Sequence, residues 1–383
     1  MSSGAPRDAD ALRKLLRFTA IYGPGRTLFK AAGRMRVAVP AVALRRPERS
    51  VGLIGCGQFG FATISYFLQR RFGSVLAACY DVDPAAAHSL ARAMRVPAVC
   101  DSVEALLGTP GLRTVYIASN HASHADQAAR ALDRGLDVYV EKPIAVEEEQ
   151  LTRLLRARRR AAGRLFAGYN RPYSAAVRDL RRAMTIRPEE GLTIECFVSG
   201  HRLGPDHWYR RPEEGTRICG NLGHWLDLMV HVLHLRGLPR HLDVAATWAD
   251  DAEPDDNLHV AMRSDLGDLL GVTLTSRCEP FEGIRESIHL QHGDTIAEIE
   301  DFRRLHIRQG ARLTRRRYWP KDVGHRAAIL QPFAPAGEIR EFGEVELSTL
   351  LMLHVADMVR SGRRESTFSF DDARAWLNRL EGT

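Results

Sequence analysis

The stretch VGLIGCGQFG, residues 51–60, decides the fold of this 383-residue chain. It opens with a short apolar run, typical of a buried strand, and helix-forming residues follow from 64 to 69. Three glycines in GxGxxG spacing therefore occupy a strand-to-helix turn, which is the context that the motif needs to bind a dinucleotide. Gly55 permits the tight turn, Gly57 lets the backbone approach a pyrophosphate, and Gly60 lets helix and strand pack closely.

The start of the helix, where Gln58 and Phe59 lie, supplies N–H donors and the positive end of a helix dipole, and both favour phosphate groups. A second apolar run, residues 75–80, ends at Asp81, 21 residues after Gly60. A carboxylate at that place accepts hydrogen bonds from the ribose hydroxyls and repels a 2′-phosphate. No arginine follows Asp81 directly, so the sequence predicts NAD rather than NADP as the cofactor.

Strands and helices alternate as far as residue 140. The expected strands cover residues 51–55, 75–80, 98–100, 114–118 and 138–140, and the expected helices cover residues 64–69, 85–94, 103–107 and 124–133. Alternation at this spacing predicts a parallel sheet with helices on both faces, which is a doubly wound Rossmann fold. We assign residues 50–145 to this domain.

A different pattern follows an arginine-rich helix at residues 147–162. Short strands are expected at residues 192–198, 242–248, 258–262, 269–274, 287–291, 295–299 and 305–308, and helices near 347–360 and 370–380. Strands this close together predict an open, mostly antiparallel sheet. We assign residues 146–383 to this second, α+β domain, because a chain of this length exceeds what one core usually organises.

Positive charge is concentrated in residues 1–49, which we treat as a basic extension. The first 50 residues hold eleven Lys and Arg against three Asp and Glu, whereas the rest of the chain holds 43 against 44. The balanced body argues against nucleic acid as a partner. Helical stretches on either side of a turn at residues 22–25 predict that the extension packs on the body or on a neighbouring subunit. Contact with a membrane surface or an acidic partner is the alternative.

The cysteines and the hydropathy pattern indicate the compartment. Six cysteines at irregular spacing, without a CxxC pair, are typical of reduced thiols and not of a disulfide framework. No run of about 18 apolar residues occurs, so a membrane-spanning helix is not expected. The sequence therefore predicts a globular cytoplasmic protein.

Four segments, in this order, carry a family resemblance. They are the glycine loop of residues 55–60, Asp81, SNH at residues 119–121 and EKP at residues 141–143. With them the chain resembles the Gfo/Idh/MocA oxidoreductases, which are sugar, inositol and nucleotide-sugar dehydrogenases. EKP after the strand that closes the nucleotide-binding half is the more specific of these elements.

The resemblance extends into the second domain and implies further contacts. GYNR at residues 168–171 resembles the family's entry to that domain, and residues 293–302 resemble its glycine-turn strand pair. By resemblance, the second domain holds the substrate, and its open sheet pairs subunits in a homo-oligomer. Further contacts to NAD are expected from Ser119, Asn120, His121, His124, Glu141 and Lys142.

The resemblance places Lys142 beside the nicotinamide and the substrate hydroxyl. Oxidation of a secondary alcohol needs a group that takes the hydroxyl proton, and a lysine next to a positively charged oxidised nicotinamide gives up its own proton more readily. The bond to Pro143 is often cis in relatives. An ordinary surface lysine after a strand is the alternative.

GNLGHWLD, residues 220–227, resembles the family's substrate-domain motif, usually Asp-x-Gly-x-His-x-x-Asp. His224 and Asp227 match its histidine and final aspartate, but glycine stands at position 220 in place of the first aspartate. In many relatives that aspartate and the histidine act together on the substrate. Here we expect Lys142 and His224 to transfer protons and Asn221 to orient the substrate, because an amide holds a hydroxyl but is no base. A purely structural histidine is the alternative.

His224, Asp227 and His231 share one face of the expected helix, which is compatible with a metal site. No third cluster at ligand spacing accompanies them, so no metal is predicted. Asp227 is expected instead to cap or orient a neighbour.

The segment GPDHWYRR, residues 204–211, is expected to be a polar, aromatic loop beside the substrate. Its rings can stack on a sugar or a base, and Arg210 or Arg211 can hold a phosphate or carboxylate. Packing of a surface loop is the alternative. The expected substrate contacts in this region and in the GYNR segment are Tyr169, Arg171, His207 and Trp208.

Taken together, the residues and the resemblance predict an NAD-dependent dehydrogenase or reductase acting on a hydroxyl or keto carbon of a sugar, cyclitol or nucleotide-sugar-like substrate. Two alternatives stay open. One is an enzyme that retains NAD and uses transient oxidation to drive elimination, hydrolysis or epimerisation. The other is a catalytically silent NAD-binding partner protein, suggested by Gly220 and the basic extension.

Overall fold

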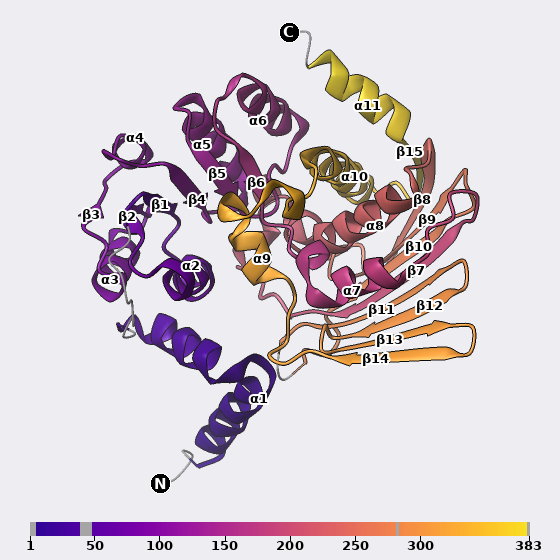
Figure 1. The fold of residues 1–383 in the computed structure, drawn as a ribbon, viewed down its shortest axis with the longest axis horizontal. Coiled ribbons are helices and arrows are strands. Elements are labelled where there is room, and N and C mark those ends of the chain that lie inside the picture. The colour runs from indigo at the N-terminus through magenta and orange to yellow at the C-terminus, as the bar shows by residue number, and fades with distance from the viewer. Residues whose placement is uncertain (1–4, 39–47, 281–282, 381–383) are drawn as a thin grey trace.

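The computed structural model describes residues 5–38, 48–280 and 283–380. Within these ranges two sheets dominate, one of six strands and one of nine (Figure 1). The smaller sheet lies in the first half of the chain with helices on its two faces, and the larger sheet lies in the second half. This is the predicted class, a Rossmann domain followed by an α+β domain.

The Rossmann sheet has the strand order β3-β2-β1-β4-β5-β6, and all its neighbouring strands run parallel. Its strands are β1 (Val51–Ile54), β2 (Leu76–Tyr80), β3 (Ala98–Val99), β4 (Thr114–Ile117), β5 (Asp137–Val140) and β6 (Leu165–Ala167). The order reverses between β1 and β4, and in such sheets ligands bind in the crevice at the carboxyl ends of the strands there. Because β6 joins this sheet, the Rossmann domain runs beyond the expected boundary at residue 145.

Helices cover both faces of the Rossmann sheet and bury its central strands. They are α2 (Ser65–Phe72), α3 (Pro84–Met94), α4 (Val103–Leu107), α5 (His121–Asp133) and α6 (Glu148–Arg160). Leu53, Ile117 and Val140 have no exposed surface. Strands covered on both faces read as continuous apolar runs, which is why the sequence indicated them.

The second sheet has the order β14-β13-β12-β11-β7-β10-β9-β8-β15, antiparallel except between β7 and β10. Its strands are β7 (Leu192–Ser199), β8 (His241–Trp248), β9 (Asn257–Ser264), β10 (Leu269–Thr275), β11 (Arg285–His292), β12 (Thr295–Glu300), β13 (Arg304–Gln309), β14 (Arg312–Arg317) and β15 (Glu365–Ser369). Figure 1 shows helices on the side that faces the Rossmann domain. They include α7 (Ala175–Ala183), α8 (Gly223–Arg236) and α10 (Phe342–Arg360), and α11 (Phe370–Arg379) closes the described chain.

The basic extension forms α1 (Ala5–Met35), which kinks at Gly23, where φ is +78°. After the kink the helix packs on the Rossmann domain, with Phe29 against Phe61 and Tyr66. At the kink it also contacts the second domain, because the Trp319 indole donates a hydrogen bond to the Ala20 carbonyl. The extension therefore touches both domains.

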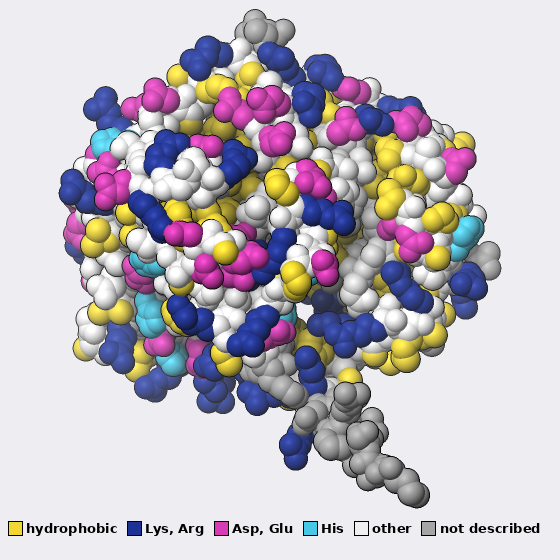
Figure 2. Space-filling view, turned by 180° about the vertical axis from the view of Figure 1, so that it is seen from behind, with side chains coloured by type: hydrophobic (Ala, Val, Ile, Leu, Met, Phe, Trp, Pro, Cys, Tyr) yellow, Lys and Arg dark blue, Asp and Glu magenta, His cyan; other side chains and the backbone are white. Residues whose placement is uncertain are grey.

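The surface is mixed in charge. Figure 2 shows Lys and Arg side chains interspersed with Asp and Glu over one face of the molecule. Every helix within the described ranges is too short or too polar to cross a bilayer. All six cysteines lie in these ranges, and each is a free thiol, as the irregular spacing predicted.

Candidate functional site

The glycine loop follows β1 and has the geometry that a dinucleotide requires. Gly55 has φ +92°, and a Cβ atom there would lie 2.3 Å from the Ala118 carbonyl oxygen. A Cβ atom on Gly60 would lie 2.1 Å from the Gly55 oxygen. At Gly57, by contrast, a Cβ atom would meet nothing within 4 Å. The loop is closely packed on its inner side and open above Gly57, where a pyrophosphate would approach.

The helix after the loop begins at Gln58, which is exposed, and widens into a π-helical turn at Gly60–Ile64 before α2. Phe59 is partly buried, and its ring centroid lies 5.8 Å from that of His325. His325 begins α9 (His325–Ile329), a helix that comes from the second domain's part of the sequence. The glycine loop therefore faces residues of both domains.

Asp81 lies at the carboxyl end of β2, beside the glycine loop. Its two carboxylate oxygens accept hydrogen bonds from the Cys56 N–H at 2.6 Å and the Asp83 N–H at 2.9 Å. A carboxylate has about four acceptor positions, so two are left for ribose hydroxyls. These two bonds hold the carboxylate beside the glycine loop, and its contact with a ribose stays a prediction.

The residues that follow β4 form hydrogen bonds with other segments of the protein. The Asn120 amide donates to the Glu214 carboxylate at 2.8 Å, and the Ala122 N–H donates to the same carboxylate at 3.1 Å. Glu214 thus caps the N-terminus of α5 from the second domain. The two ring nitrogens of His124 lie 2.8 Å from the Pro143 carbonyl oxygen and 3.2 Å from the Ser119 carbonyl oxygen, and a neutral ring donates to one of them. Burial lowers the pKa of His124 to about 4, so the ring is neutral.

Lys142 follows β5, and its peptide bond to Pro143 is cis. The Lys142 ammonium group reaches across to the second domain and donates a hydrogen bond to the Gly220 carbonyl at 2.7 Å. The neighbouring Glu141 is buried and accepts a hydrogen bond from the Tyr139 hydroxyl at 2.7 Å. Burial raises the pKa of the Glu141 carboxyl to about 7. The lysine therefore lies between the domains, at the carboxyl end of the parallel strands.

His224 lies near the start of α8, and its Nδ1 atom is buried without a hydrogen-bond partner among the described residues. Burial holds the pKa of His224 well below the ordinary value of 6.5, and the nearby cations Arg171 and Lys142 act in the same direction. His121 is affected similarly: burial and then Lys142 lower its pKa to about 2. The neutral imidazoles of His121 and His224 thus both lie within the electrostatic influence of Lys142.

His325 is a member of this group that the sequence did not indicate. Burial, Arg26 and then Arg171 hold its pKa well below the ordinary value, and Lys142 also contributes. No motif recognised in the sequence includes His325, so no local pattern marks it, and only the fold brings it to the glycine loop.

Two residues that were expected to contact the substrate are buried and contact other side chains of the protein interior. The Arg171 guanidinium forms a buried, two-bonded ion pair with Glu286, both bonds at 3.1 Å, and lies over the Trp225 ring. Tyr169 is buried, with its ring edge-on to His224 at 6.3 Å between centroids. Because its charge is already balanced, Arg171 is left out of the proposed substrate set.

The loop that contains GPDHWYRR lies against the Rossmann domain. The His121 ring centroid is 4.5 Å from that of Trp208 and 4.8 Å from that of Tyr209. The His207 ring centroid lies 5.1 Å from that of Tyr209. Aromatic side chains thus gather beside His121, near Lys142.

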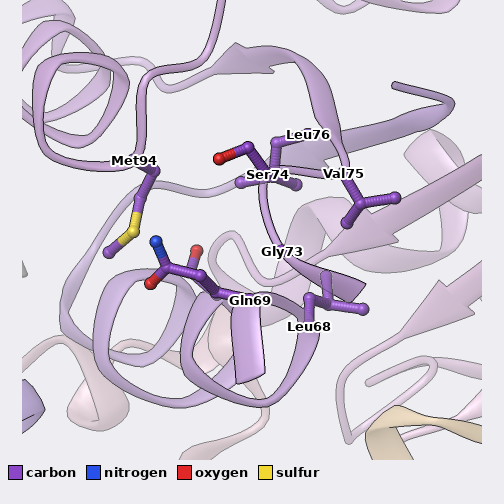
Figure 3. Close-up of a pocket in the computed structure, with 8 residues that line it drawn as sticks. Leu68, Gln69, Gly73, Ser74, Val75, Leu76 and Met94 are labelled. Carbon is purple, nitrogen blue, oxygen red and sulfur yellow. The ribbon is translucent and has the colours of Figure 1, made fainter. Parts of the chain in front are cut away.

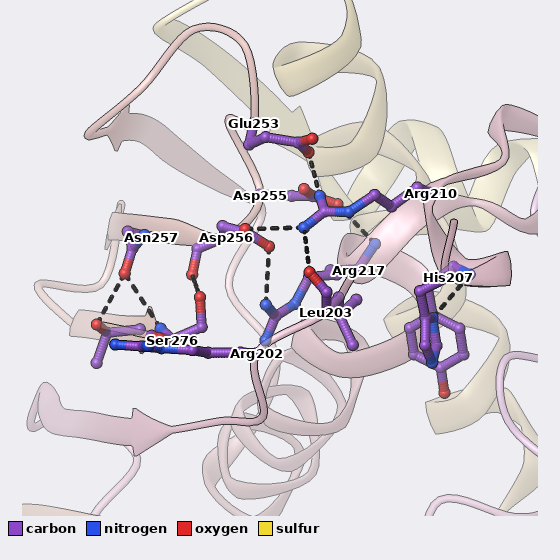
Figure 4. A network of polar contacts seen from close by, with 12 residues as sticks. Arg202, Leu203, His207, Arg210, Arg217, Glu253, Asp255, Asp256, Asn257 and Ser276 are labelled. Atoms are coloured by element: carbon purple, nitrogen blue, oxygen red, sulfur yellow. Dashed lines mark hydrogen bonds and ion pairs between the residues drawn. The ribbon is translucent and has the colours of Figure 1, made fainter. Parts of the chain in front are cut away.

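A polar network holds this loop in place (Figure 4). Arg210 forms ion pairs with Glu253 and Asp256, and the buried Arg217 binds Asp256 through its side chain and Asp255 through its backbone N–H. These pairs tie the loop to the segment between β8 and β9. Arg210, expected as a ligand for phosphate or carboxylate, is therefore already neutralised by carboxylates of its own chain.

The other predicted residues of the GNLGHWLD segment contact different parts of the protein. Asp227 is fully buried and accepts hydrogen bonds from Arg340 at 2.9 Å and Ser348 at 2.8 Å. His231 is bonded to Glu344 at 2.7 Å. Asp227 thus orients its neighbours, as expected, and its oxygens are used by partners other than the two histidines of its helix face. Asn221 is partly buried next to Gly220.

A small pocket in the Rossmann domain lies elsewhere (Figure 3). It is lined by Leu68, Gln69, Gly73, Ser74, Val75, Leu76 and Met94, among others. Val75 and Leu76 stand at the amino end of β2, whereas ligands of such sheets bind at the carboxyl ends. We therefore do not assign the pocket to the site around Lys142.

Comparison with known proteins agrees with this geometry. The profile of the family described as "Oxidoreductase family, NAD-binding Rossmann fold" matches residues 49–169. The inositol 2-dehydrogenase of Ralstonia nicotianae is 29% identical over 185 residues, which are 48% of this chain and 52% of that protein. The 1-carboxy-3-chloro-3,4-dihydroxycyclohexa-1,5-diene dehydrogenase of Comamonas testosteroni is 32% identical over 173 residues, 45% of this chain and 42% of that protein.

The chain thus spans about half the length of the curated relatives it matches. A solved structure of levoglucosan dehydrogenase, in complex with NADH and L-sorbose, has the same fold, with a TM-score of 0.68 and 15% identity. That match covers 85% of this chain and 99% of the other. By its glycine loop, its strand order and the profile match, the segment of residues 49–169 is similar to the NAD-binding Rossmann domain of the Gfo/Idh/MocA oxidoreductases.

Proposed function

We propose that this protein is an NAD-dependent oxidoreductase that acts on a hydroxyl or keto carbon of a sugar, cyclitol or nucleotide-sugar-like substrate. One observation supports this above the others. The ammonium group of Lys142 lies between the domains, at the carboxyl ends of the parallel strands, 2.7 Å from the Gly220 oxygen. That is where an open α/β sheet binds its ligand, and a proton-transferring group is what alcohol oxidation requires.

The residues at the glycine loop fit NAD. The open space above Gly57 admits a pyrophosphate, and the start of the helix at Gln58 and Phe59 presents N–H groups to it. Asp81 would bind the ribose hydroxyls with its two remaining acceptor positions. Bound there, NAD would accept or supply the hydride of the reaction.

Lys142 has three N–H donors, and the Gly220 carbonyl takes one of them. The others would hold the substrate oxygen. In oxidation the unprotonated amine would take the hydroxyl proton while the hydride goes to NAD, and in reduction the ammonium group would return that proton to the carbonyl oxygen. His224, neutral and with an unpaired Nδ1 atom, is the second residue that can take up or return this proton. Asn221 would orient a neighbouring hydroxyl.

The substrate class follows from the names of the relatives and from the aromatic side chains beside Lys142. The named relatives act on polyhydroxylated six-membered rings, an inositol and a dihydroxycyclohexadiene. Trp208 and Tyr209 offer ring faces of the kind that stack on sugars. Arg171 and Arg210 are paired with carboxylates of the chain itself, so neither is proposed to bind an anionic group of the substrate.

The outer face of the large sheet is proposed as the surface that pairs two copies of the chain. Phe197, Leu269 and Ile296 lie on it, each about half exposed. A contiguous exposed apolar patch can mark an interface, and these side chains come from three strands of one sheet, β7, β10 and β12. We expect Phe197→Asp to shift the molecular mass measured by light scattering towards the monomer, and an unchanged mass would exclude this face. With its free thiols, the protein is proposed to be cytoplasmic.

A substrate panel tests the function. The purified protein is incubated with NAD and with cyclitols, sugars or nucleotide sugars, and NADH is followed by absorbance. Stoichiometric NADH with one class supports the dehydrogenase. Co-purified NAD, product formation and no net NADH would indicate the NAD-retaining alternative. NAD binding without any turnover in either direction would leave the silent partner protein.

A further inference from the structure

The space beside Gly220 is filled by Tyr209. A Cβ atom placed on Gly220 would lie 2.5 Å from Cε2, 2.8 Å from Cδ2 and 2.9 Å from Cζ of the Tyr209 ring. Non-bonded carbons stay about 3.5 Å apart or more, so no side chain fits at position 220 while the ring is there. The glycine that departs from the family motif is therefore matched to a tyrosine eleven positions earlier in the chain.

The same glycine binds the lysine of the site. Its carbonyl oxygen accepts the hydrogen bond from the Lys142 ammonium group at 2.7 Å. The Tyr209 ring lies against Gly220. The ring edge that faces Gly220 includes Cζ, the atom that bears the hydroxyl. Tyr209 thus lies one residue away from the lysine, in the space from which a side chain at 220 would act.

Tyr209 is held from both domains. On one side its ring lies 4.8 Å from that of His121 in the Rossmann domain. The next residue, Arg210, is bound to Glu253 and Asp256 of the second domain (Figure 4). Further along the same loop, Glu214 caps α5. A side chain fixed in this way by its neighbours is suited to contact a ligand, because its conformation is set before binding.

The hydroxyl of Tyr209 has no hydrogen-bond partner among the described residues, although the side chain is partly buried. A hydroxyl both donates and accepts hydrogen bonds, whereas the carboxylate of an aspartate only accepts them. We infer that Tyr209 is a substrate-contacting residue of the lysine site, and that position 220 is glycine because Tyr209 has taken over the space and the hydroxyl-binding role of a side chain there.

The substrate contact rests on the proposed function, but the pairing of Tyr209 with Gly220 does not, so the two are tested separately. Thermal unfolding is measured for wild type, Gly220→Ala, Tyr209→Ala and the double variant. We expect Gly220→Ala to lower Tm by several degrees, and the same change to have little effect once Tyr209 is alanine. Gly204→Ala, in the same loop, is the matched control, since a Cβ atom there meets nothing within 4 Å. An equal loss in both backgrounds would overturn the pairing.

The substrate contact is tested with Tyr209→Phe, which keeps the ring and removes the hydroxyl. With a substrate identified by the panel, we expect KM to rise about tenfold with a smaller change in kcat, because the lost hydrogen bond holds the substrate throughout the reaction. NAD affinity, measured by calorimetry, should stay within about twofold. Unchanged KM and kcat would overturn the contact while leaving the oxidoreductase intact. If wild type neither binds nor oxidises any compound in the panel, the proposed function and the contact both fail, and the thermal cycle still decides the pairing.

Discussion

Replacement of Asp81 by alanine should narrow the preference for NAD over NADP. The carboxylate would bind the ribose hydroxyls of NAD with its two free acceptor positions, and a hydrogen bond to a charged group contributes about 1.5–3 kcal/mol. Loss of one such bond weakens NAD binding by about ten- to a hundredfold, since 1.4 kcal/mol is a factor of ten. NADP loses no such bond with its 2′-phosphate, and it is relieved of the repulsion from the carboxylate.

The ratio of the two dissociation constants isolates this effect. Asp81→Ala also removes the bonds to the Cys56 and Asp83 N–H groups, but that loss weakens both cofactors alike. Calorimetric titration with NAD and NADP should therefore show the ratio falling by at least about tenfold, on the arithmetic above. Asp83→Ala is the matched control: its carboxylate caps α3 through the Ala85 N–H, so the variant should lose about 1 kcal/mol of stability and keep the ratio. An unchanged ratio in Asp81→Ala would refute the assignment of this residue to the ribose.

Three further variants test the site and its support. Gly57→Ala should fold normally, because its Cβ atom enters only open space, yet it should bind NAD more weakly, because the pyrophosphate would occupy that space. Gly60→Ala should lose about 1–3 kcal/mol of stability, because its Cβ atom would lie 2.1 Å from a backbone oxygen. Equal Tm values for the two variants would contradict this. Arg340→Met should cost about 3–5 kcal/mol in urea unfolding, because it leaves the buried Asp227 carboxylate without its cation, and a loss below about 1 kcal/mol would show that the pair matters little. The pKa of Glu141 is raised from 4.5 to about 7 in the folded state, so between these pH values the folded protein binds a proton that the unfolded chain has lost, and the free energy of unfolding should fall as pH rises. Glu141→Gln should remove that fall. Curves of unfolding free energy against pH that run parallel for the two proteins would refute this role of Glu141.

The Rossmann half could be predicted closely because its signals are local. Strands buried on both faces read as apolar runs, and glycines mark the turn, so the expected β1, β2 and β4 each agree with the structure to within a residue. Strand β14 (Arg312–Arg317) was missed because five of its six side chains are exposed or basic and none alternates with a buried position. It is held by its ladder to β13 alone, which leaves no pattern in the sequence.

The candidate site was predicted only in part, for a similar reason. Residues within motifs, such as Asp81 and Lys142, could be found from spacing and resemblance. The role of Glu214 as a cap, the approach of His325 and the packing of Tyr209 on the glycine motif depend on contacts between segments far apart in the chain. No window of sequence contains both partners of such a contact.

The most direct test of the account compares NADH formation by wild type and Lys142→Met, with NAD affinity measured in parallel. Methionine keeps an unbranched side chain that is one atom shorter, and it removes the proton-transferring group. We predict that the variant binds NAD within about twofold of wild type but loses about 10²–10⁴-fold in kcat with a cyclitol or sugar that wild type oxidises. Turnover by Lys142→Met at the wild-type rate would contradict the central claim, as would wild type that binds NAD and never exchanges it for NADH with any member of the panel.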